Sequence, residues 1–154
     1  MVQTASEVIK ALQGKTLVTA ESLTGGMIGS VLTSVPGASA VYKGGIVSYV
    51  NEVKEQILGV DDSVLRSCGA VSMETAAQMA SGARKLLKAD YAVSVTGLAG
   101  PAGDEFGHEV GTVYIGFASA EENFAREYRF CGGREDVRRQ TVRSALELLL
   151  ENIV

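Results

Sequence analysis

Residues 16–20, TLVTA, and residues 91–95, YAVSV, are the two short runs that decide the fold class. Both are rich in apolar and β-branched residues, a composition typical of strands that are buried on both faces. Each is followed by a glycine-containing turn, ESLTGG in one case and TGLAGPAG in the other. Strands of this kind lie in the interior of parallel sheets that helices cover on both sides, which indicates an α/β protein.

The rest of the chain supplies the helices and the remaining strands. Apolar residues at helical spacing predict helices over 4–13, from 27 to near 36, over 51–58 with Asn51 as the cap, over 72–87 and over 132–154. Further strands are expected over 45–50, 111–119 and 124–130, the last two as a hairpin. We expect one domain over residues 1–154, a three-layer α/β/α sandwich with a mixed, mostly parallel sheet.

Composition excludes several classes of function. The net charge of the 154 residues is −4, which counts against a nucleic-acid-binding module. One histidine, His108, and two distant cysteines, Cys68 and Cys131, are too few for a metal site, so we expect neither metal nor cofactor. We expect both cysteines to be reduced packing residues. The apolar runs are too short to span a membrane and the N-terminus does not resemble a signal peptide, so we expect a cytoplasmic protein.

The turn after the first strand is the first candidate site. Ser22 lies between a strand end and a glycine-opened helix expected over 24–34, where ligands of α/β sheets collect. The amides of Thr24, Gly25 and Gly26 could hold an anion or a developing oxyanion. The alternative is that Ser22 or Thr24 simply caps the helix.

Three other segments could take part in chemistry, and each has an ordinary structural alternative. The glycine-rich loop 97–107 could approach a phosphate with its amides, or be a surface loop. Arg134 and Arg138 share one face at the start of the last helix and could clamp a phosphate, or be solvated. Lys54, one turn into the helix 51–58, could act as a base if burial lowers its pKa, or pair with nearby glutamates in solvent.

Taken together and in order, the motifs AESLTGG, GGIVSYVNEVKEQILGV, GAVSMETAAQMA, ADYAVSVTGLAGPAGD, VGTVYIGFAS and GGREDVRRQTVRSAL resemble one family. The sequence is similar to the CinA C-terminal domain family of nicotinamide-nucleotide amidases, called PncC, over roughly residues 5–150. The resemblance implies a metal-free hydrolase that converts nicotinamide mononucleotide (NMN) to nicotinic acid mononucleotide and ammonia in NAD recycling. Some members carry a further N-terminal domain, and we expect the standalone form here.

The resemblance also assigns residues. It implies that Ser22 is the nucleophile and that Lys54 is its general base. The other matching positions are expected to bind substrate or orient the reacting groups; these are Thr24, Gly25, Gly26, Tyr49, Asn51, Thr96, Gly97, Gly100, Arg134 and Arg138. Glu21 belongs to the same motif without an assigned role. Because relatives associate, we also expect a homodimer.

One loop departs from the family pattern. Asp104 stands where a second glycine is common, and His108 and Glu109 replace Lys-Pro. Loss of the lysine removes one possible phosphate contact, and the acidic residues could repel a phosphate. Two alternatives to NMN hydrolysis therefore stay open: a catalytically silent nucleotide-binding module, and an amidase that acts on a different carboxamide.

Overall fold

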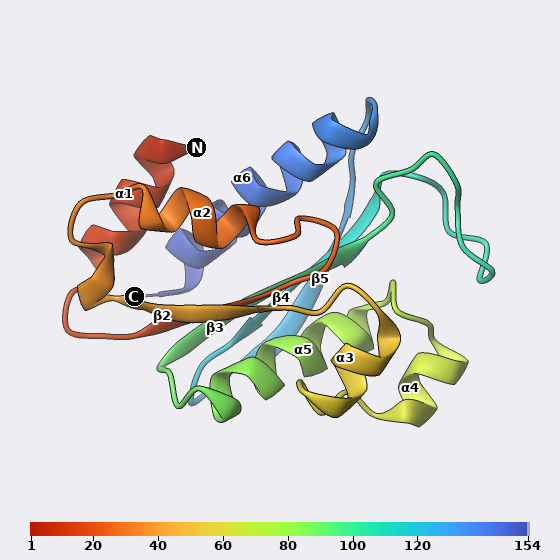
Figure 1. The fold of residues 1–154 in the computed structure, drawn as a ribbon, viewed down its shortest axis with the longest axis horizontal. Coiled ribbons are helices and arrows are strands. Elements are labelled where there is room, and N and C mark those ends of the chain that lie inside the picture. The colour runs from red at the N-terminus through yellow and green to blue at the C-terminus, as the bar shows by residue number, and fades with distance from the viewer. Residues whose placement is uncertain (154) are drawn as a thin grey trace.

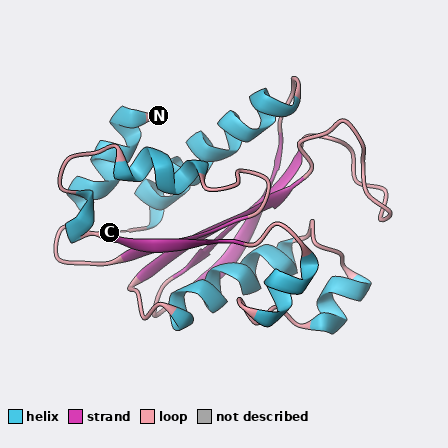
Figure 2. Ribbon diagram, in the orientation of Figure 1, coloured by secondary structure: helices cyan, strands magenta, loops and turns pink. Residues whose placement is uncertain are grey.

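The computed structural model describes residues 1–153 and shows a five-stranded sheet between two layers of helices (Figures 1 and 2). The strands are β1 (Leu17–Glu21), β2 (Tyr42–Val47), β3 (Tyr91–Gly97), β4 (Thr112–Ala118) and β5 (Asn123–Arg129). The helices are α1 (Val2–Ala11), α2 (Met27–Thr33), the 3-10 turn η1 (Ala38–Ala40), α3 (Asn51–Gln56), α4 (Asp62–Ser67), α5 (Met73–Leu86) and α6 (Arg134–Asn152). The expected three-layer α/β sandwich is confirmed.

The strand order is β2-β1-β3-β4-β5, and the sheet is mixed. β1 pairs in parallel with β2 and with β3, whereas β3–β4 and β4–β5 are antiparallel. Four of the five strands therefore run in the same direction and only β4 is reversed, so the expected mixed, mostly parallel sheet is confirmed. The long loop after β3 returns the chain antiparallel to it, and a tight turn then forms the expected β4–β5 hairpin.

The helices divide between the two faces of the sheet. Figure 1 shows α1, α2 and α6 on one face and α3, α4 and α5 on the other. Along β3, Val93 and Val95 join the core beneath α1, α2 and α6, while Ala92 belongs to the core beneath α5. Ser94, also on the α5 side, donates a hydrogen bond to Ala76 O at 2.5 Å. The strand is thus buried on both faces, as its composition predicted.

Some boundaries differ from the expectations for local physical reasons. β2 begins at Tyr42 instead of residue 45, because Tyr42 already pairs with Leu17 of β1. Gly45 lies inside this strand, where a side chain would collide with Thr19 and Tyr42. Asn51 is the first residue of α3 and not its cap, which is Val50 with no side-chain hydrogen bond. The helix α4 was not predicted, since it is short and buries only Leu65.

The topology places the ends of three strands at one edge of the molecule. β1, β2 and β3 run parallel to one another, so the residues that follow them emerge on the same side of the sheet. Ser22 follows β1, the segment leading to α3 follows β2, and the loop from 98 to 111 follows β3. In Figure 1 this loop projects beyond the sheet, next to the start of α6.

Candidate functional site

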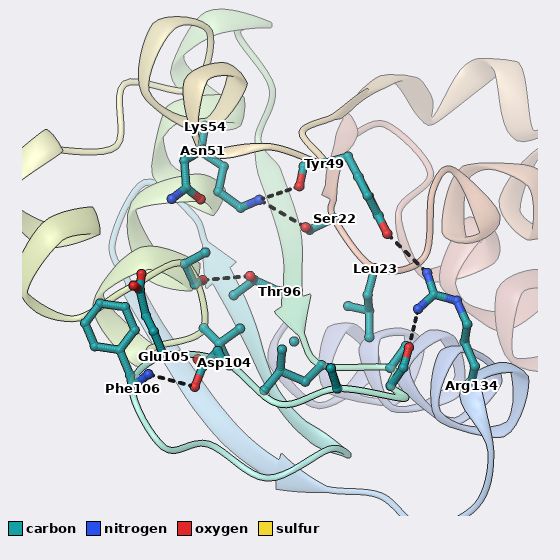
Figure 3. A pocket seen from close by; sticks show the side chains of 17 residues that line it. Ser22, Leu23, Tyr49, Asn51, Lys54, Thr96, Asp104, Glu105, Phe106 and Arg134 are labelled. Carbon is teal, nitrogen blue, oxygen red and sulfur yellow. Dashed lines mark hydrogen bonds between the residues drawn. The ribbon is translucent and has the colours of Figure 1, made fainter.

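The central feature of this edge is a buried lysine that reaches a serine from another element. Lys54 lies in α3 with 1% of its surface exposed, and Ser22 follows β1 with 7% exposed. The Lys54 Nζ donates to Ser22 Oγ at 3.0 Å (Figure 3). It also donates to the backbone oxygens of Ser48 at 2.6 Å and Tyr49 at 3.4 Å. No carboxylate pairs with Lys54 among residues 1–153.

Burial without a counter-charge changes the chemistry of this amine. Removal of Lys54 from water disfavours the ammonium form, which lowers the pKa of Lys54 from 10.5 to about 8. Roughly a tenth of the amine is therefore neutral at pH 7, far more than for a lysine in water. This is the property that a lysine needs in order to accept a proton from a hydroxyl group.

Glu21 holds the turn that presents Ser22. Its buried carboxylate accepts the Thr24 hydroxyl at 2.5 Å and the backbone N–H groups of Ile28 at 2.8 Å and Gly29 at 3.0 Å. A carboxylate at this position complements the positive N-terminus of α2. The Ser22 amide donates to Val95 O at 3.1 Å, so the turn is tied to β3 as well. The motif alone gave no role for Glu21; the packing shows it as the residue that fixes the start of α2.

The glycines of the turn have conformational roles. Gly25 and Gly26 adopt φ angles of +58° and +107°, in the left-handed region that side chains disfavour. Together they reverse the chain between Ser22 and α2. Neither lines the cavity described below, and the same holds for Thr24, whose hydroxyl is directed at Glu21. These three expected substrate-binding residues therefore support the turn in this structure.

A cavity of about 400 Å³ opens over the Ser22–Lys54 pair. This volume is within the range of small-molecule sites, roughly 300–1,000 Å³. Its lining includes eight of the expected site residues, namely Ser22, Tyr49, Asn51, Lys54, Thr96, Gly97, Gly100 and Arg134. They come from the turn after β1, the segment after β2, the end of β3 and the loop after it, α3 and the start of α6.

The two arginines expected to bind phosphate are placed differently. Arg134 lines the cavity, where its guanidinium donates to Gly100 O and, at 3.1 Å, to the Tyr49 hydroxyl. Arg138 lies outside the lining and donates to Leu23 O at 2.9 Å, to Thr24 O at 3.3 Å and to Glu135 at 2.8 Å. Arg138 thus ties α6 to the Ser22 turn, whereas Arg134 keeps a charge in the cavity without a carboxylate partner within residues 1–153.

Thr96 is buried at the end of β3 and also lines the cavity. Its hydroxyl donates to Ala70 O at 2.7 Å, which joins β3 to the segment before α5 (Figure 3). Several lining residues were not predicted from the sequence, namely Leu23, Ala70, Val71, Glu105 and Phe106. The last two lie in the loop that departs from the family pattern, which was the available signal.

In the described part of the chain, no three His, Cys, Asp or Glu side chains come together in a way that could hold a metal ion. None of the helices in residues 1–153 is long and apolar enough to cross a membrane.

Fold and site together define a three-layer α/β protein with a buried serine–lysine pair at the carboxyl edge of its sheet. The chain belongs to the CinA C-terminal domain family, whose model matches residues 2–153. It is 43% identical to the nicotinamide-nucleotide amidohydrolase PncC of Escherichia coli K12, over the whole of this chain and 95% of that protein.

Other relatives are longer proteins or solved structures. A CinA-like protein of Thermosynechococcus vestitus is 44% identical over 97% of this chain but only 37% of its own length. The chain spans about a third of the length of the first curated relatives that it matches. Among solved structures, the competence damage-inducible protein A of Klebsiella pneumoniae matches with a TM-score of 0.96 and 35% identity, covering 99% of this chain and 96% of that one.

Proposed function

We propose that this protein is a serine–lysine amidohydrolase that removes the carboxamide nitrogen of a nicotinamide nucleotide, with NMN as the substrate. The observation that carries the proposal is the 3.0 Å contact between the buried Lys54 Nζ and Ser22 Oγ at the floor of a nucleotide-sized cavity. The likeness to the Escherichia coli nicotinamide-nucleotide amidohydrolase over the full chain supports the choice of substrate.

The environment of Lys54 supports a role as general base. A neutral amine has two N–H donors and one lone pair. The carbonyl oxygens of Ser48 and Tyr49 accept the two N–H bonds, so the lone pair is left facing the Ser22 hydroxyl. Lys54 then takes the proton of Ser22 while the serine oxygen attacks the amide carbon.

The tetrahedral intermediate needs donors for its negative oxygen. The amides of Thr24, Gly25 and Gly26 were expected to supply them, but none of these residues lines the cavity, and the Gly25 amide donates to Ser22 O at 3.1 Å. The amide of Leu23, which lines the cavity beside Ser22, has no protein acceptor within residues 1–153. We therefore assign the oxyanion to the Leu23 amide.

The remaining steps use the same groups. Lys54 returns its proton to the leaving nitrogen, ammonia departs, and the acyl group stays on Ser22 as an ester. Water, deprotonated by the neutral amine, then hydrolyses this ester to give the pyridine carboxylate and free Ser22. Arg134 binds the 5′-phosphate of the substrate, a role supported by its position in the cavity lining without a carboxylate partner in the described residues.

Ammonia release from NMN by the purified protein, by Ser22→Ala and by Lys54→Ala tests the proposal. Release by the wild type and by neither variant is expected. Equal release by all three would overturn the serine–lysine mechanism. If the wild type releases no ammonia but NMN still raises its melting temperature, a nucleotide-binding module is favoured. If the wild type neither releases ammonia nor binds NMN, an amidase that acts on another carboxamide is favoured.

Three further expectations stay predictions. They are the homodimer, the absence of a nucleic-acid partner and the cytoplasmic location. Light scattering at micromolar concentration measures the first directly.

A further inference from the structure

The cavity has a second wall that the proposed mechanism does not use. The loop after β3 supplies Asp104, Glu105 and Phe106 to the lining, on the side away from Arg134 (Figure 3). Ser22 and Lys54 lie between the two sides. Asp104 is one of the residues by which the loop departs from the family pattern, and Glu105 and Phe106 follow it directly in the chain.

Phe106 is held firmly although its side chain is 39% exposed. Its ring lies against the backbone of Gly69, where even a single added carbon would come within 2.7 Å of the ring. Its N–H donates to Asp104 Oδ1 at 3.1 Å. The ring is therefore an aromatic surface fixed at the wall of the cavity.

Asp104 fixes the turn through His108. The His108 N–H donates to Asp104 Oδ1 at 2.9 Å, and the imidazole Nδ1 lies 2.7 Å from Asp104 Oδ2. The His108 ring meets the edge of Tyr114 with 6.2 Å between ring centroids. The carboxylate of Asp104 thus accepts hydrogen bonds from within its own loop. Asp104 and His108 are therefore positioning residues for Phe106.

Glu105 differs from Asp104 because it has no hydrogen-bond or ion-pair partner in the described part of the chain. Its exposed carboxylate therefore keeps its charge available at the cavity wall. Arg134, on the opposite side, likewise has no carboxylate partner there. The cavity consequently carries an acidic, aromatic side and a basic side, with the serine–lysine pair between them.

We propose that Phe106 and Glu105 form the subsite for a planar cationic ring and make the enzyme selective for pyridinium carboxamides over neutral ones. The proposal rests on the proposed function. A nicotinamide nucleotide is a zwitterion, with a positive, planar pyridinium ring at one end and a negative phosphate at the other. Its charges match the two sides of the cavity, because an aromatic face and a carboxylate both attract a cation and Arg134 attracts the phosphate.

Binding of two small carboxamides tests the subsite without relying on catalysis. 1-Methylnicotinamide and nicotinamide share the ring and the carboxamide and differ in the positive charge. By calorimetry, the wild type is expected to bind the cation about three- to tenfold more tightly than the neutral compound. Glu105→Gln and Phe106→Leu should abolish this preference, Phe106→Trp should keep it, and Glu109→Gln, an acidic control in the same loop outside the lining, should not alter it.

Kinetics extend the test to the proposed substrate. The kcat/KM for NMN is expected to fall about three- to tenfold in Glu105→Gln and Phe106→Leu, mainly because KM rises. Reduced NMN, whose dihydropyridine ring is neutral, is the control: both variants should hydrolyse it with the same kcat/KM as the wild type. Unchanged selectivity in both variants of an active enzyme would overturn the subsite and leave the proposed function standing. If the wild type releases no ammonia from NMN, the proposed function fails, and the binding preference for 1-methylnicotinamide still decides the subsite.

Discussion

Lys54 Nζ lies 3.0 Å from Ser22 Oγ, although 32 residues separate them in the chain. The contact exists because β1 and β2 are parallel neighbours, so the turn after β1 and the helix after β2 meet at one edge of the sheet. Burial at this junction leaves the amine with two backbone carbonyls and one hydroxyl as its partners. This pair and the residues around it lead to five predictions.

The pH dependence of catalysis is the first. Because the pKa of Lys54 is lowered to about 8, the neutral amine is the minor form below that pH and the major form above it. The kcat/KM should therefore rise about tenfold per pH unit below pH 8 and level off above it. Initial rates of ammonia release between pH 6 and 9.5 measure the profile. A rate that is flat across this range would contradict the assignment of Lys54 as the base.

Replacement of Lys54 by methionine should stabilise the fold. The folded state binds the Lys54 proton less tightly than the unfolded chain does, with a pKa of about 8 against 10.5. Below pH 8 both states are protonated and the folded state bears the full cost of the buried charge, roughly 3 kcal/mol. Lys54→Met removes this cost and three hydrogen bonds, so we expect a net gain of about 1–2 kcal/mol at pH 7.

The stability difference between the wild type and Lys54→Met should also depend on pH. As the pH rises from about 8 to 10.5, the unfolded chain holds more protons than the folded state, and the wild type gains stability relative to Lys54→Met. Urea denaturation of both proteins at pH 7, 8.5 and 10 measures the difference. A difference that is independent of pH would show that Lys54 is already neutral, or still fully charged, throughout this window.

Removal of the Glu21 carboxylate should loosen the Ser22 turn. Glu21→Gln leaves one acceptor oxygen where two now receive the Thr24 hydroxyl and the amides of Ile28 and Gly29. We expect a loss of about 1–3 kcal/mol in the free energy of unfolding. We also expect kcat to fall more than KM rises, since Ser22 is displaced and the cavity wall is not. Glu7→Gln, an exposed change in α1, is the control.

Arg134 should matter for phosphate and not for the amide. Arg134→Ala removes the guanidinium from the cavity wall, which should raise the KM for NMN about 10- to 100-fold. Nicotinamide riboside, which has no phosphate, should show little change. Arg139→Ala, an exposed change one turn further along α6, serves as the control. An equal effect on both substrates would instead assign Arg134 a structural role through Tyr49 and Gly100.

The sequence by itself determined the class of the fold and the order of its elements. The buried character of TLVTA and YAVSV, the glycine-rich turns after them and the hairpin near the end were sufficient, because apolar periodicity directly reflects which face of an element is buried. The family resemblance, and not spacing, singled out Ser22 and Lys54. Without it, capping by Ser22 and solvation of Lys54 would have remained the simpler interpretations.

Only the tertiary structure decided what the polar residues meet. It separated Arg134, which lines the cavity, from Arg138, which is one turn further along the same face of α6 and binds the Ser22 turn. It gave Glu21 its role at α2, and it set Phe106 against Gly69. Such partners come from elements distant in the chain, so local sequence patterns do not encode them. The pKa of a buried lysine depends on those same partners, and for that reason the chemistry of Lys54 emerges only in the folded protein.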